Sequence, residues 1–348
     1  MRVCFVAATE EELLLMWSVY EELREGGAET LFVRAGGGSR LDEMANTIGA
    51  RFDMSVQTGD APSCAAAILE RLPKTLEEFK PHWVVVHGAD GYGVAGAMAA
   101  YYASFPVAHI GSGLRFGRSL EKTGKEACRR ACETLSTVLF APTQRACSNL
   151  LSENRPARAV HTTGSTLTNS LIRLKHTNSI SGSTNRIRQR LFGGGDTPSV
   201  ILLIEHRDTL RDVLDGLVSA EKLLRGVRIV VVSQDKEFDD RGMEVTVCDG
   251  SRVIDVLLAA GRGVVVTDVG WVVEAAAVFG LGVVLVAEAT DRPEAVEAGW
   301  AVLSGLEGRR VARAVVMMLR RWVAPRTQPF DGDNAAAHVA AILVQNRH

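Results

Sequence analysis

The chain has 348 residues, of which 47% are hydrophobic and 23% charged, and its net charge is -2 at pH 7. These proportions are typical of globular domains, and the length exceeds what one hydrophobic core usually supports, which predicts two domains. The near-neutral charge argues against a polyanion-binding surface, so nucleic acid is not an expected partner.

Apolar, β-rich runs alternate with helical stretches, the pattern of parallel sheets covered by helices. Strands are predicted in the first half at Arg2–Ala7, Glu29–Arg34, Trp83–His87, Val107–Ile110, Thr137–Ala141 and Arg158–Thr162. Apolar positions at helical spacing predict helices at Glu11–Glu25, Ser63–Leu72, Ala95–Ala103 and Lys125–Leu135. Pro73 is expected to end the second of these helices.

Between Lys175 and Ser199 the chain is polar and glycine-rich, which indicates an interdomain connection. A second α/β series follows, with strands predicted at Val200–Glu205, Val227–Ser233, Glu244–Cys248, Gly263–Thr267 and Gly282–Ala287. The expected organisation is an N-terminal Rossmann-like domain (1–170), a linker region (171–199), a C-terminal Rossmann-like domain (200–328) and a C-terminal helix (329–348) that can pack back on the first domain. Ligands of such folds bind at the carboxyl ends of the strands, so a cleft between the domains is the expected site.

The six cysteines form no CxxC pair and do not cluster with histidines, so no metal site and no cofactor are predicted. Reduced, buried thiols are the simplest interpretation. The start of the chain turns acidic at Glu10, too early for a signal peptide, and the longest uncharged apolar run, Ala275–Ala287, is too short to span a bilayer. A cytoplasmic protein without membrane contact is expected.

Several polar residues lie where strands are predicted to end. They are His87 and Asp90 in HGADGYG, His109 in HIGSGLR, His206 and Arg207 in EHRD, and Asp268 and Glu274 in TDVGWVVEA. A neutral imidazole serves well in buried hydrogen bonds, so each histidine alone suits a structural role. Their shared position at strand ends favours a pocket.

These segments resemble the UDP-N-acetylglucosamine 2-epimerase family, and the resemblance covers nearly the whole chain. The motifs that carry it are VHGADGYGVAGAMAAYY (86–102), PVAHIGSGLRFG (106–117), EACRR (126–130), FAPTQRACSNLLSEN (140–154), TGST (163–166), EHR (205–207), VTDVG (266–270), TDRPEAVEAG (290–299) and PFDGDNAA (329–336). The resemblance implies an α/β protein of the GT-B fold, with two Rossmann-like domains and a cleft between them. It also implies interconversion of UDP-N-acetylglucosamine and UDP-N-acetylmannosamine, and a homodimer.

The chain departs from the family at polar positions of the N-terminal half. The family's GTRPE places an arginine near the substrate phosphates, where this chain has Glu10, and three family carboxylates are replaced by Ala89, Gly111 and Lys125. Asp90 can replace the carboxylate missing at Ala89 only if the strand has ended before residue 90. Within a strand, a shift of one residue turns a side chain to the other face of the sheet. Epimerisation needs acid and base groups within reach of C2, so the departures predict impaired catalysis.

The nucleotide cradle DSGGIQEE of the family has changed as well. Val269 stands for the serine, Trp271 for the second glycine and Ala275 for the second glutamate, whereas Asp268, Gly270 and Glu274 remain. Loss of the hydroxyl removes a charge-assisted hydrogen bond of about 1.5–3 kcal/mol. With Glu10 acting in the same direction, UDP is expected to bind roughly tens- to thousands-fold more weakly. Trp271 either lies over the helix start or packs away from it.

The main hypothesis is therefore a divergent, catalytically impaired or inactive family member with a structural or protein-association role, as a homodimer or as a heteromer with an active relative. One alternative is an active epimerase or related nucleotide-sugar isomerase, in which His206, Asp90 and Glu126 transfer protons. In that case Arg115, Arg207, Gly270, Glu274 and Arg292 would bind the substrate, although Arg115 and Arg292 also suit a structural role. The other alternative is a nucleotide-sugar sensor without turnover.

Overall fold

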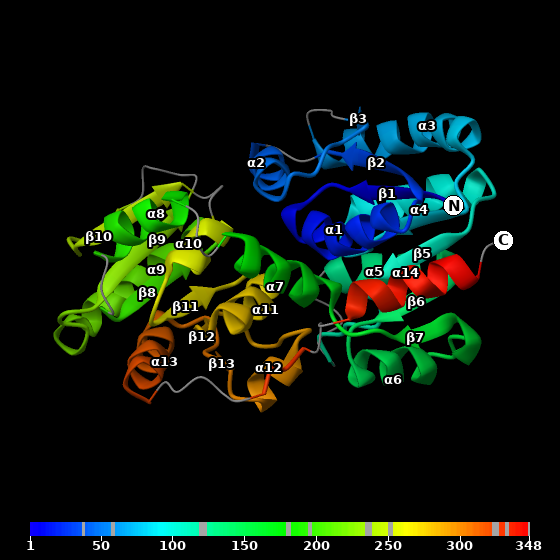
Figure 1. The fold of residues 1–348 in the computed structure, drawn as a ribbon. Coiled ribbons are helices and arrows are strands. Elements are labelled where there is room, and N and C mark those ends of the chain that lie inside the picture. Colours follow the sequence, from blue (N-terminus) through cyan, green and yellow to red (C-terminus); the bar gives the residue numbers. More distant parts are fainter. Residues whose placement is uncertain are drawn as a thin grey trace. The chain divides into compact units, whose positions relative to one another are not determined.

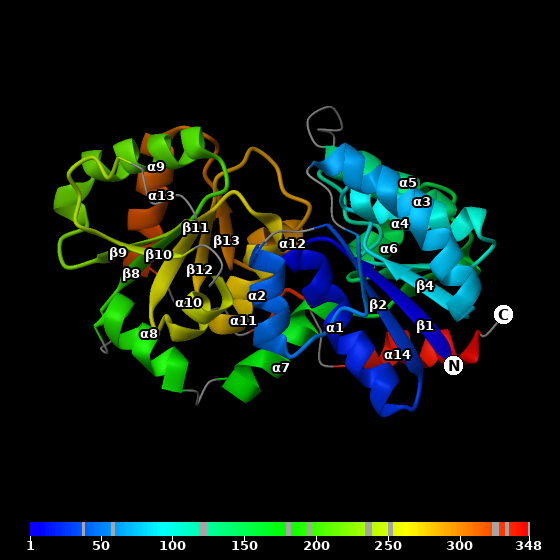
Figure 2. The same cartoon turned by 90° about the horizontal axis from the view of Figure 1, so that it is seen from above.

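The computed structural model describes the chain except for residues 37–38, 57–59, 118–123, 179–181, 194–196, 234–238, 250–252, 322–326, 331–333 and 347–348. The chain forms two compact units. Unit 1 comprises Met1–Leu171 and Phe330–His348, and unit 2 comprises Ile172–Pro329. Each unit contains one parallel sheet with helices on both faces (Figures 1 and 2).

The sheet of unit 1 has the strand order β3-β2-β1-β4-β5-β6-β7, in which every described pairing is parallel. Its strands are β1 (Arg2–Ala7), β2 (Glu29–Ala35), β3 (Met54–Val56), β4 (Trp83–Val86), β5 (Val107–Ile110), β6 (Val138–Ala141) and β7 (Val160–Thr162). All residues of β4, β5 and β6 are buried, as expected of apolar runs covered on both faces.

The helices of unit 1 are α1 (Glu10–Glu25), α2 (Ser39–Ile48), α3 (Ala61–Phe79), α4 (Gly91–Tyr102), α5 (Gly124–Leu135), α6 (Gln144–Ser152), η1 (Ala157–Ala159), the first part of α7 (Thr166–Asn178), and α14 (Ala335–Gln345). Helices α3, α4 and α5 pack side by side on one face of the sheet, and α1 packs with α14 on the other (Figure 2). Side chains cap several helix starts, because the first amides of a helix have no partner within it: Thr9, Asp60, Asp90 and Thr143.

The sheet of unit 2 has the strand order β10-β9-β8-β11-β12-β13, with every described pairing parallel. Its strands are β8 (Ser199–Leu203), β9 (Arg228–Ser233), β10 (Val245–Asp249), β11 (Gly263–Thr267), β12 (Gly282–Leu285) and β13 (Ala301–Leu303). Its helices, besides the end of α7, are α8 (Gly182–Phe192), α9 (Arg207–Ser219), η2 (Glu221–Leu223), α10 (Val253–Ala259), α11 (Gly270–Phe279), α12 (Pro293–Glu297) and α13 (Gly308–Arg321). Helices α9 and α13 lie together on one face, and α10 and α11 cover the other (Figure 2).

Every strand predicted from the sequence is present, with ends that differ by at most two residues. The short strands β3 and β13 were not predicted, because three residues give too little periodicity. The expected stop at Pro73 is wrong, since α3 continues through this residue to Phe79. Pro73 removes only one backbone amide from the hydrogen bonds of the helix. The apolar residues on both sides of it, Leu72 and Leu76, are fully buried, so packing keeps the helix continuous.

The polar segment between residues 171 and 199 is largely helical, because α7 extends to Asn178 and α8 occupies Gly182–Phe192. All six cysteines are free thiols. The expectation that they are buried is correct for Cys4, Cys64 and Cys132 and wrong for the other three, which are half-buried: Cys128, Cys147 and Cys248. Within the described residues, every helix is too short or too polar to span a bilayer.

Candidate functional site

The carboxyl ends of β1 and β4 carry a group of acidic residues that we call the acidic edge, made of Glu10, Glu11, Glu12 and Asp90. The two strands are neighbours, so the first turn of α1 and the start of α4 lie beside one another. Thr9 and Glu12 form a reciprocal capping box, in which the Glu12 carboxylate accepts the amides of Ala8 at 2.6 Å and Thr9 at 3.1 Å.

Asp90 caps helix α4 by accepting the amides of Tyr92 at 2.9 Å and Gly93 at 3.0 Å. Strand β4 ends at Val86, so Asp90 lies beyond the strand and the rule of alternating faces does not apply to it. Burial raises the pKa of Asp90, and the nearby Glu11 raises it further. Burial also raises the pKa of Glu12 well above its usual value, with Asp90 adding to the effect. Acidic groups are therefore crowded at the acidic edge, and Lys125 offsets part of their effect on Asp90.

A pair of buried histidines lies behind the acidic edge. His87 Nδ1 is 2.8 Å from the carbonyl oxygen of Ile110, and its Nε2 is 4.0 Å from Glu11 Oε1. His109 Nε2 accepts the amide of Gly88 at 3.0 Å, and burial lowers the pKa of His109 well below its usual value, with His87 as the next cause. His109 is therefore neutral at pH 7, with its proton on Nδ1, and each ring makes one buried hydrogen bond to the backbone.

Gly111 follows this histidine pair and lies in the left-handed region with φ of 75°. A Cβ atom at this position would lie 2.9 Å from both Cε1 and Nδ1 of the His87 ring. The ring is fully buried and held by Ile110, so it has little room to move. A side chain at residue 111 would therefore have to displace this ring, so the local packing disfavours a carboxylate here.

Arg115 and Glu126, two of the predicted site residues, lie in a network of ion pairs in unit 1. The Arg115 guanidinium contacts Glu133 at 2.5 Å and Glu153 at 2.7 Å. Glu126 is 1% exposed, accepts the amide of Phe116 at 3.0 Å and pairs with Arg130 at 2.9 Å. The network fixes the 111–117 loop to α5 and α6. The sequence did not indicate Glu133 and Glu153 as partners, since their approach depends on how α5, α6 and the loop come together.

In unit 2, His206 and Asp268 form a pair at the carboxyl ends of the neighbouring strands β8 and β11. His206 Nδ1 lies 2.7 Å from Asp268 Oδ2, and the same carboxylate accepts the amides of Glu205 at 2.9 Å and His206 at 3.3 Å. The His206 side chain is 77% exposed, whereas that of Asp268 is 9% exposed. A buried carboxylate that orients an exposed imidazole is an arrangement used in general acid–base catalysis. Arg207, the next residue, is exposed in the first turn of α9.

Arg292 and Glu274 form a buried ion pair in unit 2, with Nε to Oε1 at 2.7 Å, and Asp291 contacts the same guanidinium at 2.9 Å. Arg292 is 2% exposed. A Cβ atom at Gly270 would lie 2.8 Å from Arg292 Nη1, so the guanidinium occupies the space beside the start of α11. Because two carboxylates surround one guanidinium, the cluster has no net positive charge with which to attract a phosphate.

The start of α11 has lost the polar groups expected of a phosphate site. Its N-cap is Val269, which makes no side-chain cap, and Trp271 in its first turn is 5% exposed. The indole is therefore buried. Thr267 accepts the Val269 amide at 3.0 Å, so the amide just before the helix is already paired.

The two parallel sheets, with central strand orders β3-β2-β1-β4-β5 and β10-β9-β8-β11-β12, define a protein of two Rossmann-like units, the class to which the GT-B fold belongs. The sequence profile described as UDP-N-acetylglucosamine 2-epimerase matches residues 41–344. The chain belongs to this family.

Individual relatives agree with this assignment. The UDP-N-acetylglucosamine 2-epimerase of Neisseria meningitidis is 26% identical over the full length of both chains, and that of Bacillus subtilis is 29% identical over 72% of this chain and 68% of its own. The crystal structure of the Neisseria meningitidis enzyme bound to UDP-GlcNAc superposes with a TM-score of 0.89 at 23% identity, covering 99% of this chain and all of that chain. The resemblance and the GT-B fold predicted from the sequence are both confirmed.

Proposed function

We propose that this family member does not epimerise UDP-N-acetylglucosamine and acts instead through association with a protein partner. The observation that carries the proposal is the acidic edge. A helix start binds a phosphate through unpaired amides and a positive dipole, but the starts of α1 and α4 are already capped by Thr9, Glu12 and Asp90. A diphosphate would have to displace these capping side chains from the amides that they hold. The start of α11 has no side-chain cap, but Arg292 beside it is already paired with Glu274 and Asp291.

Several predicted site residues are already held by partners within their own unit, which supports the same proposal. Of the residues that could transfer protons in unit 1, Asp90 caps α4 and Glu126 holds the Phe116 amide and Arg130. Of the arginines expected to bind an anion, Arg115 and Arg292 are each held by two carboxylates. Breaking either network would leave buried charge without compensation, at a cost of about 3–5 kcal/mol.

Exchange of the C2 proton tests the proposal directly. The purified chain and the Neisseria meningitidis enzyme would each be incubated with UDP-N-acetylglucosamine in heavy water, and deuterium at C2 followed by NMR. We expect exchange with the relative only, and no thermal stabilisation of this chain by millimolar UDP, since a ligand stabilises the fold it binds. Exchange that persists in the wild-type chain and disappears in the His206→Asn variant would overturn the proposal. Stabilisation by UDP without exchange would instead indicate a sensor.

The pair of His206 and Asp268 favours the alternative of an active isomerase with rearranged acid and base groups. Here His206 would transfer the proton, with Asp268 holding its Nδ1. In that case Asp268→Asn should lower the exchange rate about as strongly as His206→Asn, because the amide would orient the imidazole wrongly. The deuterium experiment distinguishes the two functions.

Association is supported by an exposed aromatic pair at the end of α4 in unit 1. Tyr101 and Tyr102 are 62% and 69% exposed, and their rings lie 6.0 Å apart in an edge-on arrangement. Exposed tyrosines are common in protein interfaces. We propose a homodimer, or a heteromer with an active relative, in the cytoplasm, where the six free thiols remain reduced. Sedimentation of the wild-type chain and of a Tyr101→Ser/Tyr102→Ser variant would measure the contribution of this pair to a dimer.

A further inference from the structure

Unit 2 contains a pocket of about 530 Å³ between α8 and the ends of β9 and β10, away from the residues considered above. Ile187 and Leu191 of α8 and Val247 of β10 form its apolar lining. Ile187 and Leu191 are 7% and 2% exposed, so they form a buried floor. The volume lies within the range of small-molecule sites, which are mostly apolar with a few polar groups that fix orientation.

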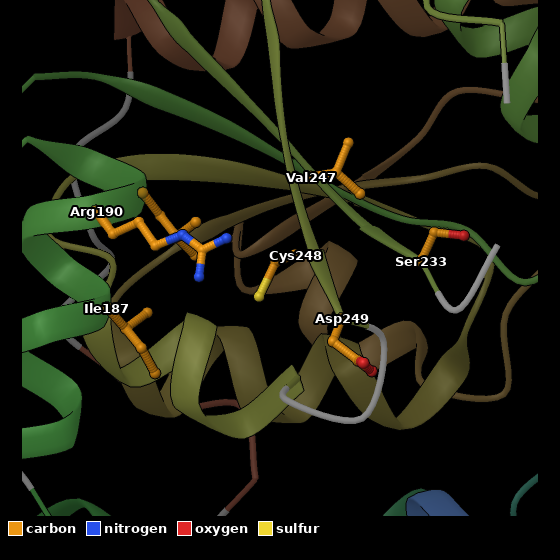
Figure 3. Close-up of a pocket in the computed structure, with 7 residues that line it drawn as sticks. Ile187, Arg190, Ser233, Val247, Cys248 and Asp249 are labelled. Carbon is orange, nitrogen blue, oxygen red and sulfur yellow. The ribbon is translucent and has the colours of Figure 1, made fainter. Parts of the chain in front are cut away.

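The polar groups of this pocket come from three different elements: Arg190 of α8, Ser233 at the end of β9 and Asp249 at the end of β10. Ser233 and Asp249 are paired in the register of the two strands. Arg190 and Asp249 are exposed, whereas the apolar floor is buried. Figure 3 shows Arg190 extending from α8 toward Cys248, with Asp249 one residue further along the strand. The pocket therefore has an apolar interior and one charge of each sign at its rim.

We propose that this pocket binds a free α-amino acid with an apolar side chain. The guanidinium of Arg190 matches a carboxylate, the carboxylate of Asp249 matches an ammonium group, and the apolar floor takes the side chain. A nucleotide fits less well, because Asp249 would repel its phosphates and a single arginine would have to neutralise them. A simple fatty acid would use the guanidinium and the apolar floor but would make no use of the carboxylate at the rim.

Cys248 makes the proposal measurable, because its half-buried thiol lines the pocket. A bound amino acid should shield this thiol from iodoacetamide. Cys128 and Cys147 are also half-buried but belong to unit 1, so they report any general change in reactivity within the same sample. Modification of each cysteine would be followed by peptide mass spectrometry.

The experiment compares L-leucine with L-leucinamide, which lacks the carboxylate, and with N-acetyl-L-leucine, which lacks the ammonium group. We expect L-leucine in the millimolar range to slow alkylation of Cys248 while Cys128 and Cys147 react as before. Each modified compound should bind roughly ten- to a hundredfold more weakly, as expected for loss of one charge-assisted hydrogen bond.

Variants complete the test. Arg190→Met should abolish protection by L-leucine and Asp249→Asn should weaken it, whereas Arg186→Met, on an exposed position of the same helix outside the pocket lining, should leave it unchanged. The proposal would be overturned by equal protection from all three compounds, by no protection from L-leucine, or by the same loss of protection in the Arg186→Met control. The test does not depend on whether the chain turns over a nucleotide sugar.

Discussion

At the scale of single residues, Gly111 shows how the histidine pair prevents a simple return of the missing carboxylate. Any side chain here must tolerate a φ of 75° and a contact of 2.9 Å with the His87 ring. We expect Gly111→Ala to lower the free energy of unfolding of unit 1 by about 2–4 kcal/mol, combining left-handed backbone strain with overpacking. Urea unfolding followed by circular dichroism would measure it.

Gly117 provides the matched control, since it has a φ of 79° and no neighbour within 4 Å of an added Cβ. Gly117→Ala should therefore cost only the backbone term, about 1–2 kcal/mol. Equal losses for the two variants would show that His87 yields to a side chain at residue 111, and the local argument against a carboxylate there would fail.

Glu12 makes a prediction about pH. Its pKa is raised well above the usual 4.5, mainly by burial and next by Asp90. Between the unfolded and the folded pKa, the folded chain binds a proton that the unfolded chain has released, so stability falls as the pH rises through this window and is regained on acidification. Glu12→Gln keeps an oxygen for the capping amides but has no proton to lose.

We therefore expect stability of the Glu12→Gln variant to vary less with pH than that of the wild type as the pH rises above 4.5. Urea unfolding at a series of pH values within this window would show the difference in slope. Glu21→Gln, at a more exposed position of the same helix, is the control and should keep the wild-type slope. Identical slopes for the Glu12→Gln variant and the wild type would contradict a raised pKa.

Residue-level roles were only partly predictable. Three of the predicted site residues lie just after strands: Asp90, His206 and Asp268. The alternation of strands and helices along the sequence predicts these positions. The partners of Arg115 and Arg292 could not be read in this way. Glu133 and Glu153 lie 18 and 38 residues from Arg115, and only the packing of α5 and α6 brings them together.

At the scale of elements, α9 and α13 pack with unusually close backbones. A Cβ atom at Gly216 would lie 2.0 Å from the carbonyl oxygen of Gly308, and one at Gly308 would lie 1.9 Å from that of Asp212. These contacts involve backbone atoms, which cannot rotate away. We expect Gly216→Ala to force the helices apart and to lower stability by roughly 1–3 kcal/mol or more, although alanine is the better helix former.

Gly124→Ala, at the start of α5 with open space around the added Cβ, is the control for this variant. It should be neutral or slightly stabilising, by about 0.4–1 kcal/mol, because alanine restricts the unfolded chain. Thermal unfolding of both variants would decide. A neutral Gly216→Ala variant would show that the helix pair can separate without loss.

The elements themselves were well predicted where burial imposes a long pattern. The strands of both series are nearly continuous apolar runs, which is the signature of strands covered on both faces. The prediction ended helix α3 at Leu72 because proline usually stops a helix. Packing of the residues on both sides of Pro73 outweighs this local preference. Residues 182–192 form helix α8 although their composition is that of a loop, because Ile187, Leu191 and Phe192 are buried.

At the scale of the whole molecule, two successive α/β series predicted two similar units, and the structure has them. Unit 1 also contains the C-terminal helix. Helix α14 belongs to unit 1 by its contacts, and the Trp83 indole donates a hydrogen bond to the carbonyl oxygen of Leu343 at 3.0 Å. Val339 and Leu343 are fully buried. The stability of unit 1 thus depends on residues synthesised after all of unit 2.

Leu343→Ala tests this dependence. Removing a fully buried leucine should cost about 2–5 kcal/mol, and we expect the loss to appear in unit 1. Hydrogen exchange followed by mass spectrometry should show faster exchange in β1 and β4, with β8 and β11 unchanged. Val344→Ala, whose side chain is next in α14 but 40% exposed, should change stability by less than about 0.5 kcal/mol. Equal acceleration in both sheets would contradict a local role for α14, because the two units would then unfold as one cooperative body.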